Sequence, residues 1–343
     1  MNNNKIKILS IENAKNWSWG LSSGVMFKFM SNNYEFSRIT GKLPHVETIK
    51  CSHCNEMMGY NVPAIFIDKN IVDMFDLVMT QNVDSIQLVS DKSKIVSRMG
   101  GMRTFIRRSN QIMINNKFDE NMSKIPAIIA TNNELGNIAK RVNNNVHVIP
   151  NGINLNVFKP RECGNTPIDD EESDGIFKVG FAGNIHGRYF ADYKGWHHYI
   201  QATLRLFPKV ETIDMLFRHS QIPHEEMPKK FFHKIDCLIS ASINEGCSNI
   251  VGEALACGVP VLLTKVGYHG ETLTDGENCI FIERNIDDIK NKIKLLMNSP
   301  ELRSKLSFNG RIFAENNQDI VKIAQAYDAV FKQVLDKRSN KNE

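Results

Sequence analysis

Short apolar runs recur along the chain, separated by loops or by segments whose apolar residues have helical spacing. This alternation is typical of an α/β fold with buried parallel strands. In the second half of the chain the expected strands lie at residues 177–183, 236–240, 259–263 and 279–282. In the first half they are less distinct and lie at residues 6–10, 64–67, 77–79, 94–97 and 125–130. We therefore expect two domains, each with its own sheet.

The apolar residues near the C-terminus predict one long helix. They recur with a period close to that of an α-helix at Ile320, Ile323, Ala324, Tyr327, Val330, Phe331 and Val334. We expect this amphipathic helix to pack back toward the first domain.

A polar stretch near the middle of the chain predicts the domain boundary. Pro150 ends an apolar run, Asn151 and Gly152 favour a turn, and residues 161–175 are polar with an acidic run at 169–172. The predicted domains are residues 1–155 and 156–318, and residues 319–343 form the final helix and a polar tail.

Two glutamates, Glu245 and Glu253, flank the start of a predicted helix between two strands of the second domain. Ser248 or Asn249 can cap this helix, and Gly258 can end it in a left-handed conformation. The free N–H groups of a helix start just beyond a parallel strand favour an anion. Two carboxylates beside such a site suit a nucleotide sugar, although acids at a helix start are also favoured by the helix dipole alone.

A basic segment follows the predicted strand at residues 177–183. It contains Gly187-Arg188 and then Lys194-Gly195, which precede a predicted helix. A strand, a glycine-containing loop and a basic helix start can hold a diphosphate. The alternative is a solvated loop of mixed charge.

Together these segments resemble the retaining glycosyltransferases of family 4, which have the GT-B fold of two Rossmann-like domains facing across a cleft. The resemblance implies that Glu245 lies near the donor sugar and that Glu253 holds the ribose. It implies that Arg188 and Lys194 bind the diphosphate, with Asn184 as the alternative to Arg188. The remaining donor contacts that it implies are Gly246, Ser248, Asn249 and Ile250.

The same resemblance places the acceptor beside the first domain, where the motifs are less clear. Trp17, Trp19 and Gly20 follow the first strand and are expected to form one wall of the acceptor site, where the tryptophans either stack on a sugar or base or pack against a neighbouring loop. A histidine that is common in this domain of the family has no clear counterpart. The segment where we would expect it contains Arg98.

Composition bears mainly on compartment and metal binding. The seven cysteines lack the spacing of a disulfide framework, which favours a reduced, cytoplasmic protein. Cys51 and Cys54 are spaced like half of a zinc site, but no second pair completes it, so we expect no metal. We also expect no signal sequence and no transmembrane segment, because no apolar run is long enough.

Charge divides unevenly between the two halves. Residues 1–150 hold 18 basic and 12 acidic residues, a net charge of +6, within a chain of net charge +4. Part of the excess is a cluster formed by Lys92, Lys94, Arg98, Arg103, Arg107 and Arg108. A solvated basic face is the first interpretation; the others are a peripheral contact with anionic lipid or a lipid-linked acceptor, an acidic glycan and, last, nucleic acid.

These features predict a retaining, metal-independent glycosyltransferase that moves a sugar from a nucleotide-diphosphate donor to a glycan, lipid-linked or other acceptor. No cofactor is expected, because the nucleotide sugar is a substrate. Two alternatives stay open: another nucleotide-using enzyme of GT-B or Rossmann type, and a noncatalytic sugar- or nucleotide-binding protein. The first strand is not followed by the G-x-G-x-x-G pattern of dinucleotide binding.

Overall fold

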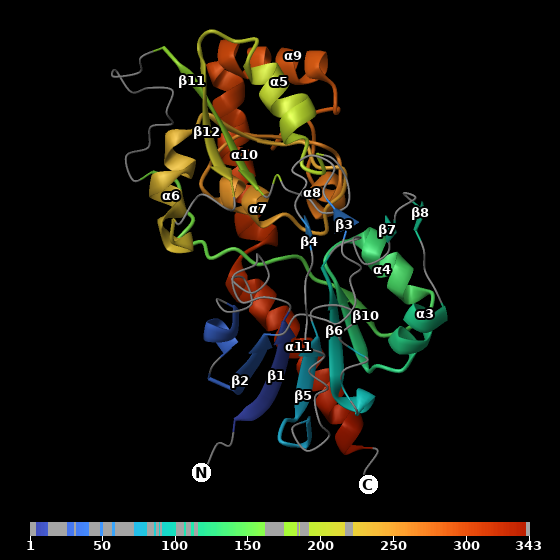
Figure 1. Cartoon of the computed structure of the whole chain (residues 1–343). Helices are drawn as coiled ribbons and strands as arrows, with labels where there is room; N and C mark the ends of the chain where they lie inside the picture. Colours follow the sequence, from blue (N-terminus) through green and yellow to red (C-terminus); the bar gives the residue numbers. More distant parts are fainter. Residues whose placement is uncertain are drawn as a thin grey trace. The chain divides into compact units, whose positions relative to one another are not determined.

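The computed structural model divides the chain into two compact units (Figure 1). The first contains residues 1–152 and 320–343, and the second contains residues 153–319. The structure describes residues 5–12, 26–30, 32–40, 49–50, 57–58, 72–80, 86, 89, 91–100, 106–107, 111–112, 116–161, 175–183, 185, 192–216 and 222–340. The expected strand at residues 64–67 lies outside these ranges.

The first unit is built on a six-stranded sheet in which every pairing is parallel. In spatial order its strands are β10 (Val146–Val148), β9 (Ala127–Ala130), β6 (Ile95–Met99), β5 (Leu77–Thr80), β1 (Ile6–Glu12) and β2 (Tyr34–Thr40). Helical segments between its strands include residues 26–30, η2 (Lys92–Lys94), α3 (Asn116–Ser123) and α4 (Asn133–Lys140). Two short antiparallel pairs are β3 (Ile49–Lys50) with β4 (Met57–Met58) and β7 (Ile106–Arg107) with β8 (Gln111–Ile112).

The second unit contains a five-stranded parallel sheet. In spatial order its strands are β12 (Val210–Leu216), β11 (Phe177–Gly183), β13 (Cys237–Ser240), β14 (Val261–Leu263) and β15 (Ile280–Phe281). Its helical elements are η4 (Trp196–Ile200), α5 (Gln201–Leu204), η5 (His224–Glu226), α6 (Met227–Lys230), η6 (Phe232–Lys234), α7 (Asn249–Ala256), α8 (Gly267–Thr272), α9 (Ile286–Asn298) and α10 (Pro300–Asn317). The chain runs from β11 to β12 on one side and then returns to β13 on the other, so the strand order reverses between β11 and β13.

Burial explains why most residues of the central strands are apolar. Every residue of β5, β6 and β9 is buried, as a sheet covered on both faces requires. The edge strand β2 was not predicted, because Glu35, Ser37 and Arg38 interrupt its apolar residues. Strand pattern thus identifies the interior of each sheet better than its edges.

The last helix, α11 (Ile320–Ser339), packs into the core of the first unit. All seven residues that predicted it are buried. They contact apolar residues of β1, β5, β6 and β9, and Tyr34 Oη donates a hydrogen bond to Asp328 at 2.7 Å. The end of the chain therefore completes the core begun by its first strands.

The expectation that Lys94 and Arg98 belong to an exposed basic surface is wrong. Lys94 is buried, and its Nζ donates to the carbonyls of Val72 and Phe75 at 3.2 and 2.9 Å. Arg98 is 3% exposed and donates from Nη2 to Asn151 Oδ1 at 2.5 Å. Both cations lie on or beside β6, where backbone carbonyls and an amide replace water as hydrogen-bond partners.

Arg103 and Arg108 lie outside the described residues, as does the side chain of Arg107. In the part of the chain that the structure covers, no helix combines the length and apolar character needed to cross a bilayer.

We predict that Phe331→Ala, at a fully buried position of α11, lowers the free energy of unfolding of the first unit by about 3–5 kcal/mol, because it leaves a cavity in the shared core. The matched variant Val321→Ala, on the exposed side of the same helix, should change it by less than about 0.5 kcal/mol. Urea unfolding measures both. Identical midpoints for the two variants would contradict the placement of α11 in this core.

Candidate functional site

Polar side chains gather where the strand order of the second unit reverses. The loop after β11 carries Lys194, and the loop after the neighbouring β13 carries Ser242 and Glu245. Open parallel sheets bind their ligands beyond the carboxyl ends of the strands at such a point. The fold therefore predicts a ligand site at these two loops.

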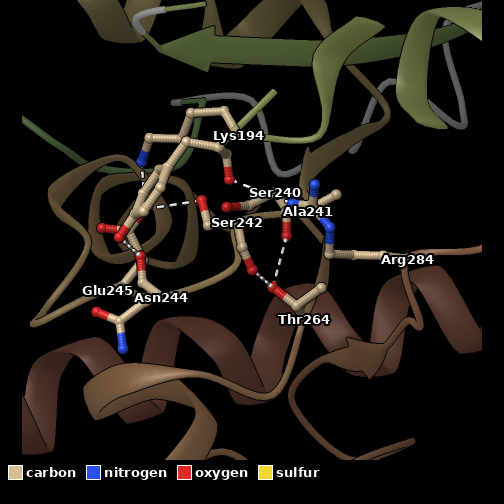
Figure 2. A network of polar contacts seen from close by, with 9 residues as sticks. Lys194, Ser240, Ala241, Ser242, Asn244, Glu245, Thr264 and Arg284 are labelled. Carbon is tan, nitrogen blue, oxygen red and sulfur yellow. Dashed lines mark hydrogen bonds and ion pairs between the residues drawn. The ribbon is translucent and has the colours of Figure 1, made fainter. Parts of the chain in front are cut away.

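Lys194 and Glu245 face each other across this point (Figure 2). Lys194 Nζ donates to Glu245 Oε1, and Ser242 Oγ donates to the same oxygen at 2.8 Å. The two charged side chains are 17% and 19% exposed, so each remains partly accessible to solvent. The result is a cation and an oriented carboxylate held side by side.

Thr264 fixes the loop after β13 from the adjacent strand end. Its Oγ1 donates to the Ser242 carbonyl at 2.6 Å, and its backbone N–H donates to the Ser240 carbonyl at 3.0 Å (Figure 2). The backbone on which Ser242 is mounted is thereby anchored to the sheet.

The loop that carries Lys194 is held by a carboxylate cap. Asp192, at a φ of 62°, accepts hydrogen bonds from the N–H groups of His197 and His198 at 2.9 and 2.7 Å. The sequence predicted that this helix start would help to bind a diphosphate, but these two N–H groups are already bonded to Asp192. In the described part of this loop, the partly exposed Lys194 side chain, and not these two N–H groups, is placed to meet an anion.

Arg284 joins the two loops from the end of the sheet. Its guanidinium donates to the carbonyls of Asp192, at 2.8 Å, and Tyr193, at 3.2 Å, and also to that of Ala241. Gly195 lets the loop that carries Lys194 lie close to the backbone of Ala241. Its φ is 74°, and a Cβ there would lie 2.6 Å from the Ala241 carbonyl oxygen. Neither Asp192 nor Arg284 was predicted, because the Asp192 carboxylate bonds backbone N–H groups and Arg284 bonds backbone carbonyls, and these contacts left no motif in the sequence.

Helix α7 supplies the second predicted carboxylate. The helix begins after Ser248, whose side chain makes no cap hydrogen bond, and it ends before Gly258, which has the predicted left-handed φ of 70°. Glu253 lies one turn inside the helix and is 4% exposed. Its Oε1 accepts a hydrogen bond from His224 Nε2 at 2.8 Å. His224, in η5, is thus a contact of Glu253 that was not predicted from the sequence.

The loop at Glu245 rests directly on the start of α8. Gly267 has a φ of 61°, and a Cβ there would lie 2.6 Å from the Glu245 carbonyl oxygen and 2.7 Å from that of Gly246. The N–H of Tyr268 donates to the Gly246 carbonyl at 2.8 Å. Only glycine fits this contact, so the position of Glu245 depends on Gly267.

A neutral buried network lies under the same loop. Burial lowers the pKa of His269 to about 4, against the opposing effects of its hydrogen bond with Gln318 and the charge of Glu245. His269 Nε2 lies 3.0 Å from Gln318 Oε1, and Gln318 Nε2 donates to Cys247 Sγ at 3.5 Å. The loop is thus supported from below without a buried charge.

The structure brings together part of the predicted site. Lys194 and Glu245 are paired, and Gly246, Ser248, Asn249, Ile250 and Glu253 follow on the same loop and helix. Arg98 lies in the first unit and is bonded to Asn151, so its side chain is committed to the fold. Five predicted residues lie outside the described ranges: Trp17, Trp19, Gly20, Asn184 and Arg188. Among the residues that are described, no group of three or more His, Cys, Asp or Glu side chains is placed to hold a metal ion.

Residues 204–313 match the family described as glycosyl transferases group 1. An uncharacterized glycosyltransferase of Methanocaldococcus jannaschii, MJ1178, is 40% identical over 86 residues, which is 25% of this chain and 24% of that protein. CapM, a capsular polysaccharide biosynthesis glycosyltransferase of Staphylococcus aureus, is 32% identical over 96 residues, which is 28% of this chain and 25% of CapM. The matched segments span about a quarter of the length of these relatives.

Solved structures resemble the chain over nearly its whole length. Anabaena HepE in complex with UDP and glucose has a TM-score of 0.70 at 16% identity, covering 95% of this chain and 99% of that one. Sucrose-phosphate synthase from Thermosynechococcus elongatus has a TM-score of 0.69 at 15% identity, covering 97% and 100%. These similarities confirm the predicted fold class: the protein has the GT-B fold, with two Rossmann-like α/β domains.

We predict that Gly267→Ala destabilises the second unit more than Gly276→Ala. Both glycines have a positive φ, so each variant carries a backbone cost of about 1–2 kcal/mol. A Cβ at Gly276 meets nothing within 4 Å, whereas one at Gly267 collides with two carbonyl oxygens, which should add about 1–3 kcal/mol. Thermal unfolding of the two variants measures the difference, and equal melting temperatures would refute the close contact.

Proposed function

We propose that this protein is a retaining glycosyltransferase that transfers a sugar from a nucleotide-diphosphate donor to a glycan or lipid-linked acceptor without a bound metal ion. The observation that carries the proposal is the pairing of Lys194 with Glu245 where the strand order of a GT-B domain reverses. The match to glycosyl transferases group 1 covers the segment that contains Glu245 and Glu253.

Lys194 is proposed to bind the diphosphate. It is a partly exposed cation at the carboxyl end of the sheet, and the first N–H groups of α7 add the positive end of a helix dipole. Arg188 is proposed as a second cation of the same loop. These groups would stabilise the negative charge that develops on the leaving nucleoside diphosphate, which is the role a divalent cation has in other enzymes.

Glu245 is proposed to orient the donor sugar. Its bonds from Ser242 and Lys194 hold one carboxylate oxygen in place. A carboxylate has about four acceptor positions in all, so this geometry is compatible with further bonds from sugar hydroxyls. Glu253 is proposed to accept hydrogen bonds from the ribose.

The reaction proposed is attack on the face from which the leaving group departs. The bond between the anomeric carbon and the phosphate oxygen breaks with its electron pair on the phosphate, and a bond forms from the acceptor oxygen to the same carbon. The acceptor proton passes to the leaving phosphate oxygen. No protein nucleophile is required, so Glu245 and Lys194 act by position and charge.

A panel of UDP-, GDP-, ADP- and CMP-sugars tests this function directly. With water as the acceptor, we expect slow hydrolysis of one donor to its sugar and free nucleotide, and we expect this turnover to persist in excess EDTA, because cationic side chains neutralise the diphosphate. Loss of turnover on chelation, with recovery on adding Mn²⁺ or Mg²⁺, would contradict metal independence. Binding of a nucleotide sugar without release of nucleotide would indicate a noncatalytic binding protein.

We further predict that Glu253→Ala and Glu245→Ala separate in a nucleotide-binding titration. Loss of the ribose contact should weaken nucleoside diphosphate and donor alike by about 1.5–3 kcal/mol. Glu245→Ala should leave free nucleotide affinity unchanged or slightly tighter, since Lys194 loses its carboxylate partner, while turnover falls. Calorimetry and a turnover assay measure the two effects, with circular dichroism as the control for folding. Equal behaviour of both variants would show that the roles are misassigned.

A further inference from the structure

We infer that His224 is a positioning residue for the nucleotide: its imidazole orients the Glu253 carboxylate toward the ribose hydroxyls, and its positive charge strengthens binding of the anionic donor. The inference rests on the role proposed above for Glu253. It adds a residue that the sequence motifs do not contain and a dependence of donor affinity on pH.

The geometry holds the two side chains together. His224 Nε2 lies 2.8 Å from Glu253 Oε1, and their side chains are 26% and 6% exposed. The imidazole also lies beside the buried ring of Phe158, with ring centroids 5.0 Å apart and the planes tilted by 54°. The imidazole thus contacts both an aromatic ring and a carboxylate, and Glu253 has one oxygen engaged by a donor.

His224 also lies in a connection that leaves the sheet at the edge where the candidate site is found. It begins η5, in the connection that follows β12. Strand β12 neighbours β11, whose loop carries Lys194, and β11 neighbours β13, whose loop carries Glu245. Three adjacent strands therefore direct Glu245, Lys194 and His224 to the same edge of one sheet. Because His224 bonds Glu253, a nucleotide whose ribose meets Glu253 would lie beside the segment that follows β12.

The charges around the imidazole favour its protonated form. Burial alone would lower the pKa of His224, but the hydrogen bond and negative charge of Glu253, together with the charge of Glu225, raise it above the usual value. Glu253 faces His224 from α7, Glu225 lies on the same segment as His224, and Phe158, from the connection between β10 and β11, carries no charge. The imidazolium offsets the charge of a nearly buried carboxylate that would otherwise repel the donor diphosphate.

The sign of the pH dependence follows from the raised pKa. Below that pKa the His224–Glu253 pair is neutral overall, and above it the pair carries a net negative charge. Nucleotide affinity should therefore fall as the pH rises through the pKa of His224. The second ionisation of the terminal phosphate, near pH 6, contributes a separate background that a variant without the histidine will also show.

The test is calorimetric titration of UDP, GDP and ADP between about pH 6 and pH 9. His224→Gln retains an N–H donor but not the charge, so it should keep the affinity that the wild type has above the pKa of His224 and should lack the fall in affinity as the pH rises. His224→Phe loses both and should weaken binding about tenfold. His233→Gln is the matched control, because His233 bonds the Lys159 carbonyl at 2.9 Å and should retain the fall in affinity.

A double-mutant cycle separates a positioning role from direct contact. If His224 acts through Glu253, adding His224→Phe to Glu253→Ala should change affinity by less than about twofold. A full additional loss would overturn the inference, as would wild-type affinity and pH profile in His224→Phe. In either case nucleotide binding by the wild type would leave the proposed function standing. If none of the three nucleotides binds the wild type, the proposed function itself fails, and the inference fails with it.

Discussion

Close backbone contact at two glycines is the constraint on which the candidate site depends. Gly195 lets the Lys194 loop lie against Ala241, and Gly267 lets α8 lie against the carbonyls of Glu245 and Gly246. Each contact is too short for a Cβ, and each glycine has a positive φ that other residues adopt at a cost. The distance between Lys194 and Glu245 is therefore a consequence of backbone packing, and Arg284 and Thr264 hold the same loop by bonding the carbonyls of Ala241 and Ser242.

The support under the site is connected to the two ends of the second unit. Gln318 contacts His269 and Cys247 with its side chain, and its carbonyl accepts a hydrogen bond from the N–H of Ile153 at 2.7 Å. Ile153 is the first residue of the unit and Asp319 the last. The network beneath Glu245 thus includes the residues where the chain enters and leaves this unit. A neutral His269 suits that position, since a charge buried there would oppose folding.

Local signals in the sequence predicted the parts of the structure that are local. Strand, loop and helix start follow one another within a few residues around Glu245 and Glu253, so the positions of Ser248, Gly258 and the next strand could be predicted. Asp192, Arg284 and His224 act on partners that lie far away in the sequence or through backbone atoms, and no periodicity reports such bonds. Lys94 and Arg98 were misassigned for the opposite reason: charge predicts exposure on average, and here backbone carbonyls and Asn151 replace water.

The Lys194–Glu245 pair also determines what a donor encounters. Both side chains are less than one-fifth exposed, and Glu245 is already bonded by Ser242 and by Lys194, so little rotamer freedom remains to be lost when a ligand binds. A bare anion would compete with Glu245 for Lys194. A nucleotide sugar would instead offer its phosphates to the lysine and its hydroxyls to the carboxylate, so that neither charge is left unpaired. With the roles proposed for these residues, the pair would favour a ligand that carries both groups over one that carries only phosphate, which is the discrimination that a glycosyl donor requires.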